Sequence, residues 1–279
     1  MKTLYLTDLD GTFLDTNAQI TRFSADTINF LSSKGVLFTV ATARTFATVI
    51  PMFKDVSLTC PVVLMNGVCI YDPVAKKNLN VHTLDIETAK KAEEIFRKYN
   101  KNPMFYYEYD SKIRVEYKEL VNKEQESYVS NRDNFFNKGF VRVEKYTYDS
   151  DCNFIYIVTL DKKAEIEGIY KEVSALPDID CTFYNDNYTD CYFFEGMKKG
   201  ISKATGALEV KKMLGADKIV AFGDNKNDIP LFEIADEAYA VANACDELKQ
   251  KATGIIGSNS EDAVAKFLLE RYESGLINK

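Results

Sequence analysis

Short, uninterrupted apolar runs alternate with helix-like segments in the first and last thirds of this 279-residue chain. An apolar run without polar alternation indicates a strand buried on both faces, and such strands belong to parallel sheets covered by helices. The same rhythm at both ends of the chain favours one doubly wound, mostly parallel α/β core built from both ends. The apolar runs lie at residues 4–7, 36–41, 61–65, 218–222 and 239–242.

The middle of the chain has a different pattern and composition. Twelve of the 17 tyrosines lie between Asp85 and Tyr188, and residues 112–117 alternate between charged and apolar side chains. Such alternation is typical of a half-buried strand in an antiparallel hairpin. We interpret this stretch as an α+β domain inserted into the core. The predicted organisation is a core at residues 1–82 and 189–279, with the inserted domain at residues 83–188.

Charge and histidine content exclude several kinds of function. The chain has 42 acidic residues against 35 Lys plus Arg, a net charge of −7, which argues against a binder of nucleic acid or anionic membranes. His82 is the one histidine, so an H-E-x-x-H zinc site is excluded and catalysis is expected to use carboxylates. No signal-peptide pattern and no run near ~18 apolar residues occurs, which predicts a cytoplasmic protein without a membrane partner.

Two acidic loops follow predicted parallel strands, where ligands of open α/β sheets bind. The first loop, at residues 8–12, reads Asp-Leu-Asp-Gly-Thr, and its aspartates are two positions apart, so a strand-like extension places both on one face. Two close carboxylates favour a divalent cation or a shared proton. The second acidic loop, at residues 223–228, reads Gly-Asp-Asn-Lys-Asn-Asp.

Two further features provide partners for an anion. Thr42-Ala43-Arg44 offers a hydroxyl and exposed amides where a helix begins. Lys203 lies on the helix before the second acidic loop and could reach back as a fixed positive charge. Hard oxygen ligands favour Mg²⁺, which commonly takes one or two carboxylates together with substrate phosphate. The combination therefore predicts a Mg²⁺-assisted phosphate site.

These motifs resemble those of the haloacid dehalogenase (HAD) superfamily phosphatases. Asp8-Leu9-Asp10-Gly11-Thr12 is similar to the first motif, and Thr42, Lys203 and Gly223-Asp224-x-x-Asn227-Asp228 match the second, third and fourth in order. The insertion between the second and third motifs resembles the large cap of the Cof-like branch. The resemblance implies a Rossmann-like core, and an α+β cap that closes over the site and selects the substrate.

The resemblance also implies a role for each matched residue. Asp8 would attack phosphorus and form an aspartyl-phosphate, and Asp10 would act as general acid and base. Mg²⁺ would be held by Asp8, the backbone carbonyl of Asp10, and Asp224. Asp228 would orient Lys203 or a metal-bound water, and Arg44 is left open between a substrate contact and a surface salt bridge. The groups that would hold phosphoryl oxygens are Thr42, Lys203, Asn227 and the amides of Leu9 and Ala43.

These roles imply a Mg²⁺-dependent phosphatase acting on small phosphorylated metabolites such as sugar phosphates. A phosphotransferase or phosphomutase with the same aspartyl-phosphate chemistry is the main alternative. The large insertion disfavours a receiver-type signalling domain, and the presence of both nucleophile and acid disfavours an inactive binding protein. The sequence leaves open the physiological substrate, the cap residues that set specificity, and the oligomeric state.

Overall fold

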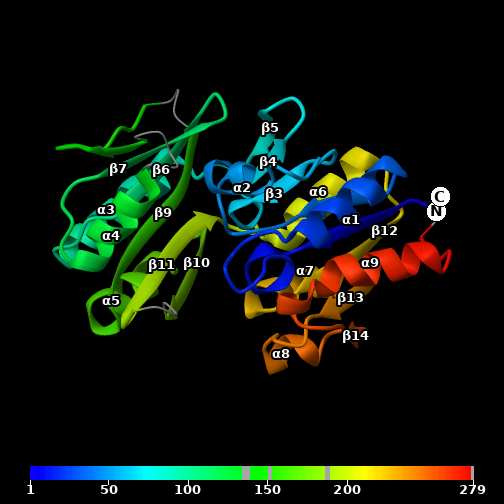
Figure 1. Ribbon diagram of the computed structural model, residues 1–279. Coiled ribbons are helices and arrows are strands. Elements are labelled where there is room, and N and C mark those ends of the chain that lie inside the picture. The colour runs from blue at the N-terminus through cyan, green and yellow to red at the C-terminus, as the bar shows by residue number, and fades with distance from the viewer. Residues whose placement is uncertain (134–138, 150–152, 186–188, 278–279) are drawn as a thin grey trace. The chain divides into compact units, whose positions relative to one another are not determined.

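The computed structural model describes residues 1–133, 139–149, 153–185 and 189–277, which form two compact units. The first unit combines Met1–Asn80 with Ser202–Lys279, and the second is Val81–Ile201 (Figure 1). The predicted fold class, a mostly parallel α/β core with an inserted α+β domain, is confirmed. In the part of the chain that the structure describes, no helix is long and apolar enough to cross a membrane.

A five-stranded parallel sheet forms the centre of the first unit (Figure 1). Its longer strands are predominantly apolar, which is why helices must cover both faces. Leu4 and Leu6 of the strand Thr3–Thr7, for example, are fully buried. In sheet order the strands are β14 (Gly254–Ile255), β13 (Glu237–Ala240), β12 (Lys218–Gly223), β1 (Thr3–Thr7) and β2 (Leu37–Val40).

The connections of this sheet run in two directions away from β1 and β12. The chain steps from β1 to β2 through one helix, and from β12 to β13 in the opposite direction through another. Because such crossovers are right-handed, the two connecting helices, α1 and α7, cover opposite faces. The strand order therefore reverses between β1 and β12, and crevices for ligands form at such a reversal. The helices are α1 (Arg22–Ser33), α2 (Phe46–Met52), α6 (Lys203–Leu214), α7 (Ile229–Ile234), α8 (Asp246–Lys249) and α9 (Ala263–Glu273).

A small three-stranded sheet extends the first unit beyond β2. It contains β3 (Val62–Leu64), β4 (Cys69–Asp72) and β5 (Lys77–Val81), in that order. A single parallel bridge between Ala41 and Val63 joins it to the end of β2.

The second unit is built on a six-stranded sheet that is antiparallel except for the pair β7 and β8. The predicted hairpin turns at Asp110 and Ser111, whose φ angles of 47° and 60° are those of a tight two-residue turn. In sheet order the strands are β10 (Ile179–Asn185), β11 (Cys191–Lys198), β9 (Asn153–Lys162), β6 (Met104–Tyr109), β7 (Lys112–Tyr117) and β8 (Phe140–Arg142). The helices are α3 (Ile86–Lys98), α4 (Lys123–Asp133) and α5 (Lys163–Val173).

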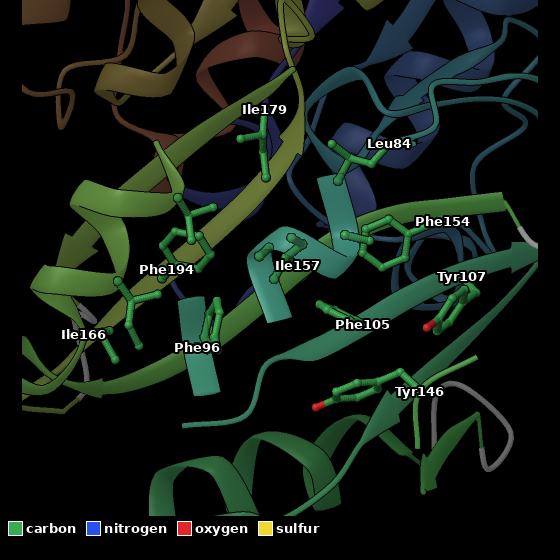
Figure 2. Close-up of a cluster of buried hydrophobic side chains, with 14 residues drawn as sticks. Leu84, Phe96, Phe105, Tyr107, Tyr146, Phe154, Ile157, Ile166, Ile179 and Phe194 are labelled. Carbon is green, nitrogen blue, oxygen red and sulfur yellow. The ribbon is translucent and has the colours of Figure 1, made fainter. Parts of the chain in front are cut away.

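An aromatic core joins the sheet of the second unit to its helices (Figure 2). Phe96 of α3 meets Phe194 of β11 edge to face, with ring centroids 5.6 Å apart. Phe105 and Phe154 form a second such contact at 4.9 Å. This geometry is favoured between aromatic rings, and the cluster gives the second unit a hydrophobic core of its own.

The boundary of the second unit differs from the one drawn from sequence at its C-terminal side. Residue 188, the predicted end of the inserted domain, lies outside the described residues. Strand β11, which the sequence prediction placed in the core, pairs with β9 and β10 and belongs to the second unit. A strand's partners are set by tertiary pairing, which a local apolar run does not encode.

Candidate active site

The candidate site lies at the carboxyl ends of the central strands, where the strand order reverses. Asp8 directly follows β1 and Asp224 directly follows β12. Since these strands are neighbours, their loops meet, and the amide of Asp8 donates a 3.0 Å hydrogen bond to the carbonyl of Phe222. Lys203 enters as the first residue of α6, whose N-terminus is capped by Ser202. The topology thus brings residues from both ends of the chain to one place.

Lys203 links two aspartates in a buried cluster. Its Nζ donates hydrogen bonds to Oδ1 of Asp8 at 2.6 Å and to Oδ1 of Asp228 at 2.8 Å. Lys203 is 1% exposed, Asp228 0% and Asp8 5%. Oδ2 of Asp228 accepts hydrogen bonds from the amides of Asp224 and Asn225, at 3.0 and 3.2 Å. Asp228 therefore uses both oxygens to hold Lys203 and the loop after β12, consistent with the orienting role that the sequence suggested.

Two glycines permit the close packing of the acidic loops. Gly11 has a φ of +77°, and a Cβ there would lie 2.4 Å from Oδ2 of Asp224. A Cβ at Gly223 would lie 2.7 Å from the side chain of Asp228. Both positions therefore exclude a side chain, and the first also requires a backbone conformation that favours glycine.

Negative charge exceeds positive charge in this cluster, because three carboxylates face one lysine. Burial, reinforced by the charge of Asp228, raises the pKa of Asp224 to about 6. Burial also raises the pKa of Asp8, against the attraction of Lys203. For Lys203, burial acts to lower the pKa, but the charges of Asp228 and Asp8 outweigh it and raise the pKa above its usual value. Lys203 is thus held as a cation, and the carboxylates would gain from a further positive charge.

The donor set fits a hard divalent cation. One carboxylate oxygen from each of Asp8, Asp224 and Asp228 lies within 4.8 Å of the others. Oxygen ligands of this kind suit Mg²⁺, which would also neutralise the excess negative charge. Because both oxygens of Asp228 already accept N–H bonds, Asp8 and Asp224 are the carboxylates best placed to hold the ion.

Asp10 is outside this carboxylate group. Its half-exposed carboxylate accepts hydrogen bonds from Nε and Nη2 of Arg44, each at 2.6 Å. Of the two possibilities left open for Arg44 by the sequence, the structure contains a salt bridge, and its partner is a candidate catalytic residue.

The remaining predicted phosphate ligands lie on the loops expected for them. Leu9 and Thr42 are buried, while Ala43 and Asn227 are exposed. Thr42 follows β2, and its hydroxyl accepts a 3.2 Å hydrogen bond from the amide of Arg44. The backbone of Thr42 bonds to Val63 and Asn66. In the part of the chain that the structure describes, Thr42, Ala43 and Asn227 form no hydrogen bond with the carboxylate cluster, so their contact with phosphate stays a prediction.

Sequence reasoning assigned no role to Thr12 or Asn243, which both fix the first acidic loop. Thr12 Oγ1 donates to Oδ1 of Asp224 at 3.0 Å. Asn243 donates from Nδ2 to the carbonyl of Gly11 at 2.8 Å, and its Oδ1 accepts from the amide of Asn259 at 3.0 Å. Thr12 stood within the first motif and could have been suspected. Asn243 is distant in sequence, and no local pattern indicates its contact.

Comparison with known proteins identifies this arrangement. A sequence model of the haloacid dehalogenase-like hydrolases matches residues 5–268. The chain is 26% identical to 5-amino-6-(5-phospho-D-ribitylamino)uracil phosphatase YitU of Bacillus subtilis, over 95% of this chain and 96% of that protein. It is 23% identical to pyridoxal phosphate phosphatase YbhA of Escherichia coli, over 94% and 95%. A haloacid dehalogenase-like hydrolase from Bacteroides thetaiotaomicron has the same fold, with a TM-score of 0.79, 19% identity and coverage of 98% and 100%.

The fold, the site and these similarities define a phosphatase built on a parallel α/β core with a cap. The chain belongs to the haloacid dehalogenase-like hydrolase family. The resemblance of the chain to the Cof-like branch of this family is confirmed.

Proposed function

We propose that this protein is a Mg²⁺-dependent phosphatase that hydrolyses small phosphomonoesters through an aspartyl-phosphate on Asp8. The observation that carries the proposal is the buried contact between Lys203 and Asp8, beside Asp224. Lys203 donates a hydrogen bond to Oδ1 of Asp8 and so orients the carboxylate. The other oxygen, Oδ2, is then the one that attacks phosphorus. The adjacent positive charge also offsets the repulsion between a carboxylate and an anionic phosphate.

The reaction would proceed in two displacements. Oδ2 of Asp8 forms a bond to phosphorus while the bond to the leaving oxygen breaks, and protonated Asp10 gives its proton to that oxygen. Water then attacks phosphorus and passes a proton to Asp10, and the bond to Asp8 breaks to release inorganic phosphate. Throughout, Lys203 holds Asp8, and Thr42, Asn227 and the amides of Leu9 and Ala43 orient the phosphoryl oxygens.

Mg²⁺ would be bound by the carboxylates of Asp8 and Asp224 and by the backbone carbonyl of Asp10. When bound, it supplies positive charge that stabilises the phosphoryl oxygens. Asp228 would keep Lys203 and the loop of Asp224 in place through its hydrogen bonds.

Release of inorganic phosphate tests this proposal. The purified protein should hydrolyse 4-nitrophenyl phosphate with Mg²⁺ and should lose this activity in excess chelator, with recovery on readdition of Mg²⁺. A panel of phosphorylated metabolites, which should include pyridoxal phosphate and sugar phosphates, ranks substrates by kcat/KM. Full activity in chelator would exclude the metal assignment. Consumption of substrate without free phosphate would favour transfer to another hydroxyl.

Mg²⁺ should raise the thermal midpoint Tm more at pH 7.5 than at pH 5. In the metal-free protein the pKa of Asp224 is raised to about 6 by burial and Asp228, so at pH 5 a cation must displace a proton. A raised carboxyl pKa means that protonation stabilises the metal-free fold at low pH, and this contribution is lost as the pH rises through about 6. Thermal denaturation with and without Mg²⁺ at both pH values measures the difference.

The matched variants for this test are Asp224→Asn and Asp26→Asn. The first should remove most of the Mg²⁺-dependent gain in Tm. The second changes an exposed aspartate on α1 and should keep the gain and its pH dependence. An equal gain at both pH values in the wild-type protein would contradict the assignment of Asp224.

A further inference from the structure

Arg44 binds Asp10 through two parallel hydrogen bonds. Nε bonds to Oδ2 and Nη2 to Oδ1, each at 2.6 Å. This fork geometry restricts both torsions of the aspartate side chain, whereas a single contact to a lysine would leave rotation about the bond. The side chains of Arg44 and Asp10 are 29% and 50% exposed, so the pair contributes little to the stability of the fold.

Arg44 is itself fixed by backbone contacts to two loops. Its amide donates a 3.2 Å hydrogen bond to Oγ1 of Thr42, and its carbonyl accepts a 3.0 Å hydrogen bond from the amide of Met65. These partners follow β2 and β3. The guanidinium group is therefore carried on a stretch of backbone anchored to the ends of two strands.

The backbone around Asp10 is also held in place by hydrogen bonds, as that of Arg44 is. The Asp10 side chain, however, has no partner in the carboxylate cluster. Asp10 lies in the turn Leu9–Phe13 with an extended backbone, at φ −72° and ψ 121°. The next residue, Gly11, is in the left-handed region, and the carbonyl of Gly11 accepts a hydrogen bond from Asn243. The carboxylate group of Asp8, Asp224 and Asp228 does not include Asp10. Without Arg44, this half-exposed side chain would rotate among its staggered conformers.

We propose that Arg44 is a positioning residue that holds the Asp10 carboxyl in the orientation from which it exchanges a proton with the leaving group. This inference rests on the proposed function, in which Asp10 is the general acid and base. Proton transfer requires the acid to be within hydrogen-bonding reach of the leaving oxygen, and small misplacements of a catalytic group reduce rates strongly. The bidentate contact supplies that placement at the half-exposed edge of the site.

Leaving-group dependence tests the role of Arg44. An alkyl phosphate needs protonation of its leaving oxygen, whereas 4-nitrophenolate leaves without it. In Arg44→Ala, kcat/KM for an alkyl phosphate such as glycerol 2-phosphate should fall about 10²-fold. For 4-nitrophenyl phosphate, kcat/KM should fall less than about threefold. This constant reports the step in which the leaving group departs, and 4-nitrophenolate departs without a proton from Asp10. Arg44→Lys should lie between Arg44→Ala and the wild type.

Arg22→Ala is the matched control, because Arg22 forms an arginine–aspartate salt bridge of 2.8 Å with Asp26, away from the site. It should leave both kcat/KM values unchanged, and Tm should be similar in all three variants.

The inhibition constant of inorganic phosphate should stay within about twofold of the wild type in Arg44→Ala.

Three results would overturn the proposal. Equal losses on both substrates would show that Arg44 has no special connection to proton transfer. A weakened inhibition by phosphate would make Arg44 a substrate contact. An unchanged or increased kcat/KM for the alkyl phosphate would mean that the salt bridge holds Asp10 in an unproductive orientation. Each result leaves wild-type phosphatase activity intact, whereas failure of the proposed function would appear as a wild-type protein that releases no phosphate.

Discussion

Asp8→Asn is expected to lower the kcat for 4-nitrophenyl phosphate by roughly 10⁴- to 10⁶-fold, the size of loss that follows removal of a nucleophile. The substitution keeps the shape of the side chain and an oxygen that can accept the hydrogen bond from Lys203. It removes the negative charge and the nucleophilic oxygen, so no aspartyl-phosphate can form. Phosphate release measures the loss, and the Mg²⁺-dependent gain in Tm should largely survive through Asp224 and the carbonyl of Asp10.

Asp26→Asn makes the same chemical change on the exposed surface of α1 and should keep wild-type turnover. The nucleophile assignment fails if Asp8→Asn retains a substantial part of the wild-type kcat. Trapping of the phosphorylated enzyme, followed by mass spectrometry, should place the added phosphoryl group on the peptide that contains Asp8.

Lys203→Met is expected to abolish turnover and to lower the free energy of unfolding by about 3–5 kcal/mol, as found when one partner of a buried ion pair is removed. Lys203 is 1% exposed and lies between Asp8 and Asp228, so its loss leaves two buried carboxylates without their cation. Methionine retains most of the side-chain volume. Chemical denaturation measures stability, and the loss should be smaller at pH 5 than at pH 8, because protonation of the carboxyls relieves the repulsion.

The control is Lys251→Met, which breaks an exposed salt bridge to Glu233 of 2.7 Å. Exposed pairs of this kind change stability by at most about 1 kcal/mol, and turnover should be unaffected. A Lys203→Met protein with wild-type stability would show that the lysine does not compensate the buried carboxylates.

The core of the fold follows from local patterns. Continuous apolar strands cannot be half exposed, and helical segments between them require a parallel sheet, so the α/β class was predictable. The acidic loops were predictable for the same reason, because the carboxyl ends of parallel strands meet at one edge. The assignment of β11 was not, since its pairing with β9 and β10 depends on long-range register.

In the site, charged residues were predictable as a set but their contacts were not. The family resemblance implied that Asp228 would orient Lys203 or a metal-bound water, and in the structure its two oxygens bind Lys203 and two loop amides. The bidentate contact between Arg44 and Asp10 depends on the geometry of two loops that are separated by 34 positions. No periodicity or motif in one sequence specifies such a contact.

The interior position of β1, between β12 and β2, has a consequence for synthesis of the protein. β1 is synthesised before the other strands of its sheet, but one of its two neighbours, β12, is made only after the entire second unit. Lys203 and Asp228 also come from that late segment, so the growing chain has no complete site until β12 has joined the sheet. Because the second unit has its own aromatic core, it is able to fold first, in keeping with the folding of domains as units. Until β12 arrives, the nascent core exposes an apolar strand edge, which makes this stage of synthesis the one most exposed to aggregation.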